Sequence, residues 1–267
     1  MTHAFSILMA MTAYACLSTG LMLMKKGIGW LGWKGTKDRS YYANLSIWIT
    51  GFVVMNLYGI PNALALKILP SDVVAAFAGW GIVVLVFGSN VFLKENISST
   101  DLIFSSLIIA GIVALNLFSR PKVLGGADPT ATIVLFLLPF LMFIAGLIIS
   151  WTDKIKTALF AAVSGLSAGL MVVALGLLVR KYEYQITLYF ESPFLYLYVG
   201  LGLLSLVALQ IALKHGPLMI IGPVQYATHI SYPLVAALVV FRRPVHAVQY
   251  FAVGVIVYSV VGILRRR

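Results

Sequence analysis

The chain is a succession of long apolar runs separated by short polar segments. The runs cover residues 5–24, 44–66, 72–93, 101–118, 130–150, 157–179, 193–213, 217–240 and 246–264. A helix that crosses a hydrocarbon core about 30 Å thick needs roughly 20 residues, so each run is long enough. The pattern predicts nine transmembrane helices with little chain left for a soluble domain. We therefore expect an all-α integral membrane protein that forms a single transmembrane domain over residues 1–267.

Composition and charge favour the same class. Hydrophobic residues make up 61% of the chain and charged residues 10%, whereas charged residues make up about 25% of soluble domains. The formal net charge is +11, and the basic residues gather in the loops, where they set topology and contact anionic head groups. We expect the lipid bilayer, and no nucleic acid, as the partner of these residues.

The distribution of basic residues predicts an orientation. With the N-terminus outside, the cytoplasmic segments hold twelve lysine and arginine residues and the outer segments hold seven. Cytoplasmic loops of membrane proteins carry the excess of basic residues. We expect a multi-pass protein of the cell or inner membrane, with the N-terminus outside and the C-terminus in the cytoplasm.

An internal repeat relates the two halves of the chain. Four residues recur at an offset of 147: Ala65, Leu66, Lys67 and Pro70 match Ala212, Leu213, Lys214 and Pro217. Residues 92–98 also match 240–246 at an offset of 148, and residues 18–22 match 167–171 at an offset of 149. The first four predicted helices therefore correspond to the last four.

The repeat predicts a 4+1+4 topology. Repeat 1 covers about 5–118, a linking helix covers 130–150, and repeat 2 covers about 157–264. Because the linking helix is a single crossing between two sets of four, it places the second copy upside down in the membrane. Inverted repeats are typical of secondary transporters, which bind their solute near the midplane and alternate access by rocking one half against the other.

Four segments carry a family resemblance. They are LMLMKKGIG at the end of the first helix, NALALKILP, FLKENIS, and ALKHGPLMIIGPVQY at the start of the eighth. With them the chain resembles the NIPA family of magnesium transporters, within the drug/metabolite transporter superfamily that includes EamA-type proteins. The resemblance implies a drug/metabolite-transporter-like bundle and magnesium transport. Gly59, and the pair Arg242 and Arg243, stand where NIPA-like proteins are expected to carry acidic residues.

The acidic residues bear on the magnesium interpretation. All eight lie in predicted loops or at helix ends: Asp38, Asp72, Glu95, Asp101, Asp128, Asp153, Glu183 and Glu191. A hard divalent cation prefers oxygen ligands, with carboxylates supplying the charge. A neutral, zwitterionic or anionic solute therefore fits this distribution better than Mg²⁺, and metal ligands stay unassigned.

Polar residues near the middle of the eighth predicted helix are the first candidate binding site. Gly222, Gln225, His229 and Tyr232 share one helix face. The first repeat has apolar residues at the last three equivalent positions: Ala78, Ile82 and Leu85. A strip that is polar in one copy only indicates an asymmetric solute site, where His229 would hydrogen-bond the solute or take up a proton. A histidine that only links two helices is the alternative.

A second candidate cluster lies in the second predicted helix. Asn56 and Asn62 flank Tyr58, and Pro61 frees a backbone carbonyl that would open the helix there. Gln210 lies within one position of the repeat partner of Asn62. These amides are candidate solute ligands, although such side chains also join neighbouring membrane helices.

Other features have structural interpretations. The small residues from Ser164 through Gly165 to Gly169 predict close helix packing. Glu95 is expected in a solvated turn. Pro223 and Pro233 predict a kink or a hinge in the eighth helix.

Motifs of catalytic sites are absent from the sequence, which contains no H-E-x-x-H, Walker A loop or catalytic cysteine–histidine context. We expect no enzyme activity and no cofactor, and we expect a secondary transporter of a small molecule or ion.

Three alternatives stay open: a Mg²⁺ transporter, a flippase-like carrier of lipid-linked or phosphorylated groups, and a non-transporting subunit of a membrane complex. The flippase alternative predicts a lateral opening and a role for Arg180, Lys181, Arg242 and Arg243. Association as a homodimer or with another membrane protein is also open.

Overall fold

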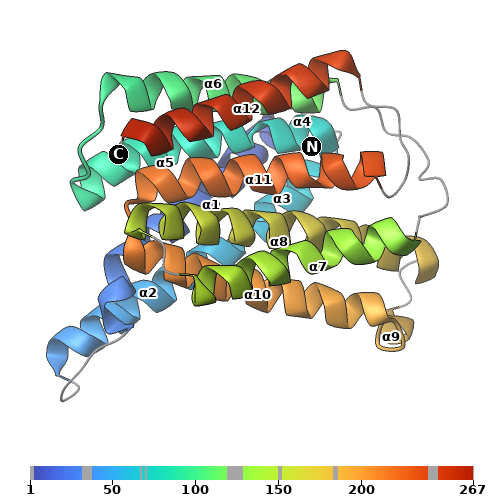
Figure 1. Ribbon diagram of the computed structural model, residues 1–267, viewed down its shortest axis with the longest axis horizontal. Helices are drawn as coiled ribbons and strands as arrows, with labels where there is room; N and C mark the ends of the chain where they lie inside the picture. Colours follow the sequence, from blue (N-terminus) through green and yellow to red (C-terminus); the bar gives the residue numbers. More distant parts are fainter. Residues whose placement is uncertain are drawn as a thin grey trace. The chain divides into compact units, whose positions relative to one another are not determined.

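The computed structural model describes residues 3–31, 38–66, 68–69, 71–118, 129–149, 152–182, 186–239 and 246–266 (Figure 1). The described residues form helices and connecting turns, with no strand among them. Lys67, Pro70, Arg242 and Arg243, which entered the sequence predictions, lie outside these residues.

The helices follow the predicted apolar runs. Their bounds are α1 His3–Gly27, η1 Ile28–Trp30, α2 Arg39–Leu57, α3 Gly59–Leu66, α4 Ser71–Ala76, α5 Ala78–Leu93, α6 Ser99–Leu117, α7 Pro129–Ile148, α8 Asp153–Tyr182, α9 Ile186–Tyr189, α10 Pro193–His215, α11 Leu218–Val239 and α12 Ala247–Arg266. Every predicted run therefore contains at least one helix.

Seven helical segments of the described residues are long and apolar enough to cross a membrane: His3–Trp30, Arg39–Ala65, Val73–Leu93, Ser99–Leu117, Asp153–Leu175, Pro193–His215 and Ala247–Arg266. A shorter apolar helix covers Thr132–Ile148. α11 is not among the seven although it is 22 residues long, and Gln225 and His229 lower its hydropathy. An all-α, multi-pass membrane protein is confirmed, whereas nine crossings and the 4+1+4 topology stay predictions.

Pro61 breaks the second predicted helix, but not at Asn62. Proline lacks a backbone N–H, and its ring clashes with the carbonyl four residues earlier, which here is that of Leu57. α2 ends at Leu57 and α3 begins at Gly59, while the backbone N–H of Asn62 donates to the Tyr58 carbonyl at 3.1 Å. Pro223 and Pro233 leave α11 uninterrupted.

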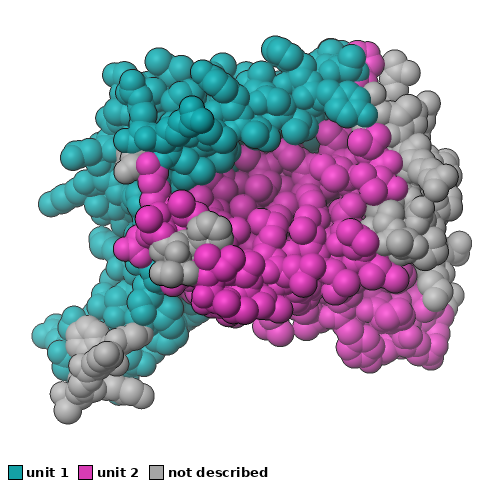
Figure 2. Space-filling model, viewed as in Figure 1, with its two compact units in different colours: residues 1–119, 213–223, 247–267 teal, residues 120–212, 224–246 magenta. Residues whose placement is uncertain are grey.

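Unit 1 comprises residues 1–119, 213–223 and 247–267 (Figure 2). In it α1 lies against α2. Glycines lie at the contact, where a Cβ added to Gly20 would stand only 2.7 Å from the Gly51 carbonyl oxygen. α12 packs along α6 (Figure 1), where the Gln249 amide donates to the Leu115 carbonyl at 3.2 Å. Close backbone approach at glycines is a common mode of helix packing in membranes.

Unit 2 comprises residues 120–212 and 224–246 (Figure 2). Its apolar core includes Phe136 of α7, Leu170 of α8, Leu201 of α10 and Tyr232 of α11. These four helices bring together the residues of the candidate site described next.

Candidate functional site

α8 and α11 approach each other closely inside unit 2, as the small residues of α8 predict. A Cβ added to Gly165 would collide with Thr228 Oγ1 and the Gln225 carbonyl oxygen, and would lie 3.0 Å from the His229 nitrogen. A Cβ on Gly169 would lie 2.8 Å from the His229 carbonyl oxygen. Only glycine fits at these two positions, so the predicted close packing is confirmed.

Polar side chains join α8, α10 and α11 beside this crossing. Gln225 Nε2 donates to Ser164 Oγ at 3.2 Å, and Ser205 Oγ donates to the Ser164 carbonyl oxygen at 3.0 Å. The two serine oxygens are 3.2 Å apart. Because the Ser205 proton is directed to the carbonyl, the Ser164 hydroxyl donates to Ser205 and accepts from Gln225. The serines therefore hold one end of the Gln225 amide in place.

The other end of that amide has no hydrogen-bond partner among the described residues. Gln225 Oε1 is buried there without a hydrogen bond, and so are Ser167 Oγ of α8 and Ser231 Oγ of α11. Burying an unpaired polar group costs about 1–3 kcal/mol, and buried polar groups in proteins are as a rule paired. An amide oxygen held beside a hydroxyl pair in this way is able to accept a hydrogen bond from a polar ligand.

His229 and Tyr232 continue the polar side of α11. The Tyr232 hydroxyl donates to the Leu135 carbonyl of α7 at 3.0 Å, so it is satisfied within the protein. No hydrogen bond joins the His229 imidazole, which is partly buried, to another described residue. We call Gln225, His229 and Tyr232 the α11 polar strip. It offers hydrogen-bonding groups and no carboxylate.

The remaining predicted ligands divide between the units. Asn56 and Asn62 belong to unit 1, while Gln210 and the α11 polar strip belong to unit 2. Asn56 is exposed and donates to the Phe52 carbonyl of its own helix at 2.7 Å. Asn62 Oδ1 is buried and has no partner in the residues that the structure covers. Gln210 is partly buried. Four of the six predicted ligands, Gln210 and the three residues of the α11 polar strip, therefore lie in unit 2, and the two asparagines lie in unit 1.

Sequence reasoning missed a pair of charged residues at the junction between α10 and α11. The Glu95 carboxylate accepts from the backbone nitrogens of Leu218 at 2.7 Å and Met219 at 3.1 Å. The Lys25 ammonium donates to the carbonyls of Leu213 and, at 2.8 Å, Gly216. We call Lys25 and Glu95 the junction clamp. The expectation of a solvated turn at Glu95 is therefore wrong, because this acid caps a helix 123 positions away, beyond the reach of a local pattern.

The clamp matches the charges of the two helix ends that it joins. The first backbone N–H groups of a helix and its last carbonyls lack partners within the helix, and the helix dipole favours an anion at the former and a cation at the latter. Glu95 stands at the start of α11 and Lys25 at the end of α10. All of these residues belong to unit 1, so the clamp fixes the first turn of the helix that carries the polar strip.

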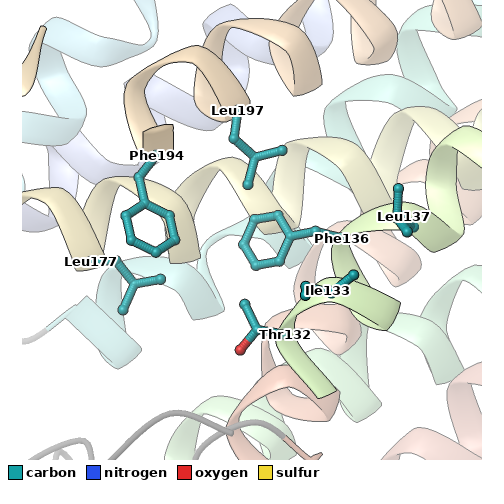
Figure 3. A pocket seen from close by; sticks show the side chains of 7 residues that line it. All are labelled: Thr132, Ile133, Phe136, Leu137, Leu177, Phe194 and Leu197. Carbon is teal, nitrogen blue, oxygen red and sulfur yellow. The ribbon is translucent and has the colours of Figure 1, made fainter. Parts of the chain in front are cut away.

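A lateral cavity of 510 Å³ lies between α7, α8 and α10 of unit 2 (Figure 3). Its lining is Thr132, Ile133, Phe136 and Leu137 of α7, Leu177 of α8, and Phe194 and Leu197 of α10. Phe136 is only 4% exposed and forms its inner wall, whereas Ile133 at 60% and Leu137 at 50% lie at its open side. The cavity is apolar except for the Thr132 hydroxyl.

Metal ligands do not cluster in the part of the chain that the structure describes, since it contains no group of three or more His, Cys, Asp or Glu residues able to hold an ion. Comparisons with protein-family models, with curated proteins and with solved structures give no match for this chain.

Proposed function

We propose that the protein is a secondary transporter that moves a small polar solute by alternating access, with solute recognition at the α11 polar strip. One observation carries the proposal: Gln225 is held by Ser164 at its amide nitrogen, while its buried amide oxygen has no partner within the described part of the chain. An unsatisfied buried polar group in a membrane helix is costly and needs a physical explanation, which a bound solute would supply.

The chemistry of the strip indicates the class of solute. An amide, an imidazole and hydroxyl groups both donate and accept hydrogen bonds, and no carboxylate lies among them to balance a cation. A neutral or zwitterionic solute with a hydrogen-bond donor for Gln225 Oε1 suits this set. His229 would bind the solute as neutral imidazole or couple its movement to a proton.

The internal repeat supports transport independently of the site. Three matches at offsets of 147, 148 and 149 relate the first four predicted helices to the last four, and inverted repeats of this kind belong to secondary transporters. The resemblance to NIPA-like and EamA-type proteins agrees with such a mechanism. Magnesium remains the alternative solute that the NIPA resemblance implies.

The two solute classes are separable by experiment. A magnesium transporter should keep its uptake in the variant His229→Ala, and Mg²⁺ should raise its thermal midpoint in detergent. Recognition of a polar organic solute at the strip predicts that His229→Ala loses uptake and that Mg²⁺ leaves the thermal midpoint unchanged. A matched control is Leu203→Ala in α10, where Leu203 is 60% exposed.

A second candidate function is a flippase-like carrier of lipid-linked or phosphorylated groups. The lateral cavity favours it, because a carrier of an amphiphile needs an apolar path for the chain beside a polar path for the head group. Phe136 of the cavity wall and Tyr232 of the strip belong to one buried cluster inside unit 2, which supports this alternative. A non-transporting subunit would show neither exchange nor lipid movement.

Exchange in proteoliposomes tests the proposal. Purified protein is reconstituted and loaded with one unlabelled solute, and uptake of its labelled counterpart is measured at two pH values. The panel contains Mg²⁺, amino acids, nucleotide sugars and lipid head groups. Saturable exchange of a polar organic solute supports the proposal, whereas exchange of Mg²⁺ alone selects the alternative.

A further inference from the structure

The first part of α11 belongs to unit 1 and is held there by contacts with unit 1 residues. The Glu95 carboxylate accepts hydrogen bonds from the backbone nitrogens of Leu218 and Met219. About one turn later, Gly222 lies against α5, where a Cβ added to Gly222 would stand only 2.6 Å from Leu85 Cδ2. This start of α11 is therefore fixed to the part of unit 1 that contains α5.

The rest of α11 is held in unit 2, and its contacts there begin with Gln225. Gln225 Nε2 donates to Ser164 Oγ of α8 at 3.2 Å. A Cβ added to Gly165 of α8 would collide with Thr228 Oγ1, so the two helices are in direct contact at this point. The division between the two units falls after Pro223. Between Gly222 and Gln225, α11 therefore changes from contacts with α5 to contacts with α8.

Pro223 weakens the helix at this division. Proline has no backbone N–H, so the Met219 carbonyl loses the hydrogen bond that the residue at position 223 would otherwise donate to it. α11 continues through Pro223 without interruption, but bending the helix there has one backbone hydrogen bond fewer to break. Sharp bends in long helices are found mainly at prolines and glycines. α11 therefore has a point of low resistance to bending between its two sets of contacts.

α10 crosses the division between the units near its end. The division falls after Ala212, and α10 ends at His215, so only the last turn of α10 belongs to unit 1. The Lys25 ammonium holds the turn that follows, because it donates to the carbonyls of Leu213 and Gly216. The end of a helix is readily distorted, since its last four carbonyls have no partner within the helix. A bend is therefore needed inside α11 rather than inside α10.

We propose that Pro223 is the hinge of α11, where the helix bends when the transporter changes the side of the membrane to which its solute site opens. The start of α11 stays with α5, while the part beyond Pro223 moves with α8. Gln225 lies two residues beyond the hinge, so bending displaces the amide assigned to the solute. Pro223 is therefore a positioning residue that acts through Gln225. This inference rests on the proposed transport function.

Three variants test the hinge in the proteoliposome exchange assay. Pro223→Ala supplies the missing N–H and stiffens α11. Pro223→Gly supplies the same N–H, but glycine is conformationally permissive and keeps the helix easy to bend. Pro61→Ala is the matched control, because it makes the same change at a proline whose flanking helices, α2 and α3, both belong to unit 1. Circular dichroism verifies that each variant is folded, and Pro223→Val replaces Pro223→Ala if that chain does not fold.

The expected result is a slower exchange in one variant. The maximal exchange rate should fall about fivefold in Pro223→Ala, on the scale of one backbone hydrogen bond that has to break when the helix bends. The solute concentration at half-maximal rate should stay close to that of the parent chain, because the groups that bind the solute are unchanged. Pro223→Gly should recover most of the parent rate, and Pro61→Ala should keep it.

The parent rate in Pro223→Ala would overturn the hinge. A rate in Pro223→Gly as low as that in Pro223→Ala would also overturn it, because the ring of the proline rather than the bending of the helix would then matter. An equal fall in Pro61→Ala would do the same, since that proline lies within one unit.

A parent chain that exchanges no solute would contradict the transport proposal, and amide hydrogen exchange then decides on the hinge by itself. The amides of residues 224–227 lie directly beyond Pro223 in α11. Their protection should be higher in Pro223→Ala than in the parent chain, and higher than in Pro223→Gly, because only alanine both restores the hydrogen bond and favours the helix. Equal protection in the three chains would overturn the hinge.

Discussion

Gln225 of α11 donates a hydrogen bond to the Ser164 hydroxyl of α8, with 3.2 Å between Nε2 and Oγ. This contact fixes an amide whose oxygen is buried and unpaired. The arrangement contributes little to stability, since one favourable bond is offset by one unsatisfied acceptor. The proposed solute binding gives a physical reason for keeping such a group in an apolar helix.

Replacing Gln225 with leucine should leave stability nearly unchanged. Gln225→Leu removes the bond to Ser164 and also the unpaired oxygen, and these two effects oppose each other, so the free energy of unfolding should change by less than about 1 kcal/mol. Thermal unfolding in detergent measures it. Ser205→Ala is the matched comparison: it removes a satisfied hydroxyl that donates to the Ser164 carbonyl and should destabilise the fold more. Strong destabilisation by Gln225→Leu would instead indicate a structural amide.

The α8–α11 crossing should tolerate no side chain at Gly165. Gly165→Ala places a methyl group against Thr228 and the Gln225 carbonyl, and overpacking of this kind costs about 1–3 kcal/mol. Gly200→Ala in α10 is the control, because no atom lies within 4 Å of its added Cβ and alanine is the better helix former. The thermal midpoint should fall for Gly165→Ala and stay level or rise for Gly200→Ala. Equal midpoints would contradict the close crossing.

The Tyr232 hydroxyl should contribute to the contact between α7 and α11. Tyr232→Phe removes its bond to the Leu135 carbonyl and leaves a buried carbonyl with one partner fewer, at a cost of about 0.5–1.5 kcal/mol. Tyr250→Phe in α12 is the control, since Tyr250 is 55% exposed. Thermal unfolding compares the midpoints of the two variants. Equal midpoints would contradict a stabilising hydrogen bond from Tyr232 to the Leu135 carbonyl.

The junction clamp should hold the start of α11. Glu95→Gln removes the negative charge from a helix N-terminus and leaves one amide oxygen for the two N–H groups of Leu218 and Met219, with an expected loss of about 1–2 kcal/mol. Glu191→Gln, at an exposed position, should have little effect. Amide hydrogen exchange gives a local measurement: protection of residues 218–221 should decrease in Glu95→Gln alone. Unchanged protection would contradict the capping role.

The length of the apolar runs predicts much of this fold, because membrane helices are long and apolar enough to be recognised singly. Each predicted run contains a helix, and Pro61 marks the interruption between α2 and α3, although its effect falls at Leu57 rather than at Asn62. The break is displaced because proline disturbs the carbonyl four residues before it. The split between α4 and α5 at Phe77 has no comparable marker in the sequence.

The candidate site was predictable only where its residues share one helix. Gln225, His229 and Tyr232 follow helical spacing, so the sequence groups them, and Gly165 and Gly169 signal a close neighbour without identifying α11. The partners Ser164 and Ser205 come from different helices, and Glu95 reaches Leu218 across 123 positions. Such pairings depend on the packing of helices, which the period of one segment does not encode.

Exchange by the Gln225→Leu variant tests the central claim most directly. The parent chain, Gln225→Leu and the lipid-facing control Leu203→Ala are reconstituted at equal density, and exchange of the best solute of the panel is measured in each. The account predicts saturable exchange of a polar organic solute by the parent and by Leu203→Ala, and a reduction of at least about tenfold in Gln225→Leu, as expected when one buried hydrogen bond to a ligand is lost. Full exchange by Gln225→Leu, or none by the parent with any solute, would contradict it.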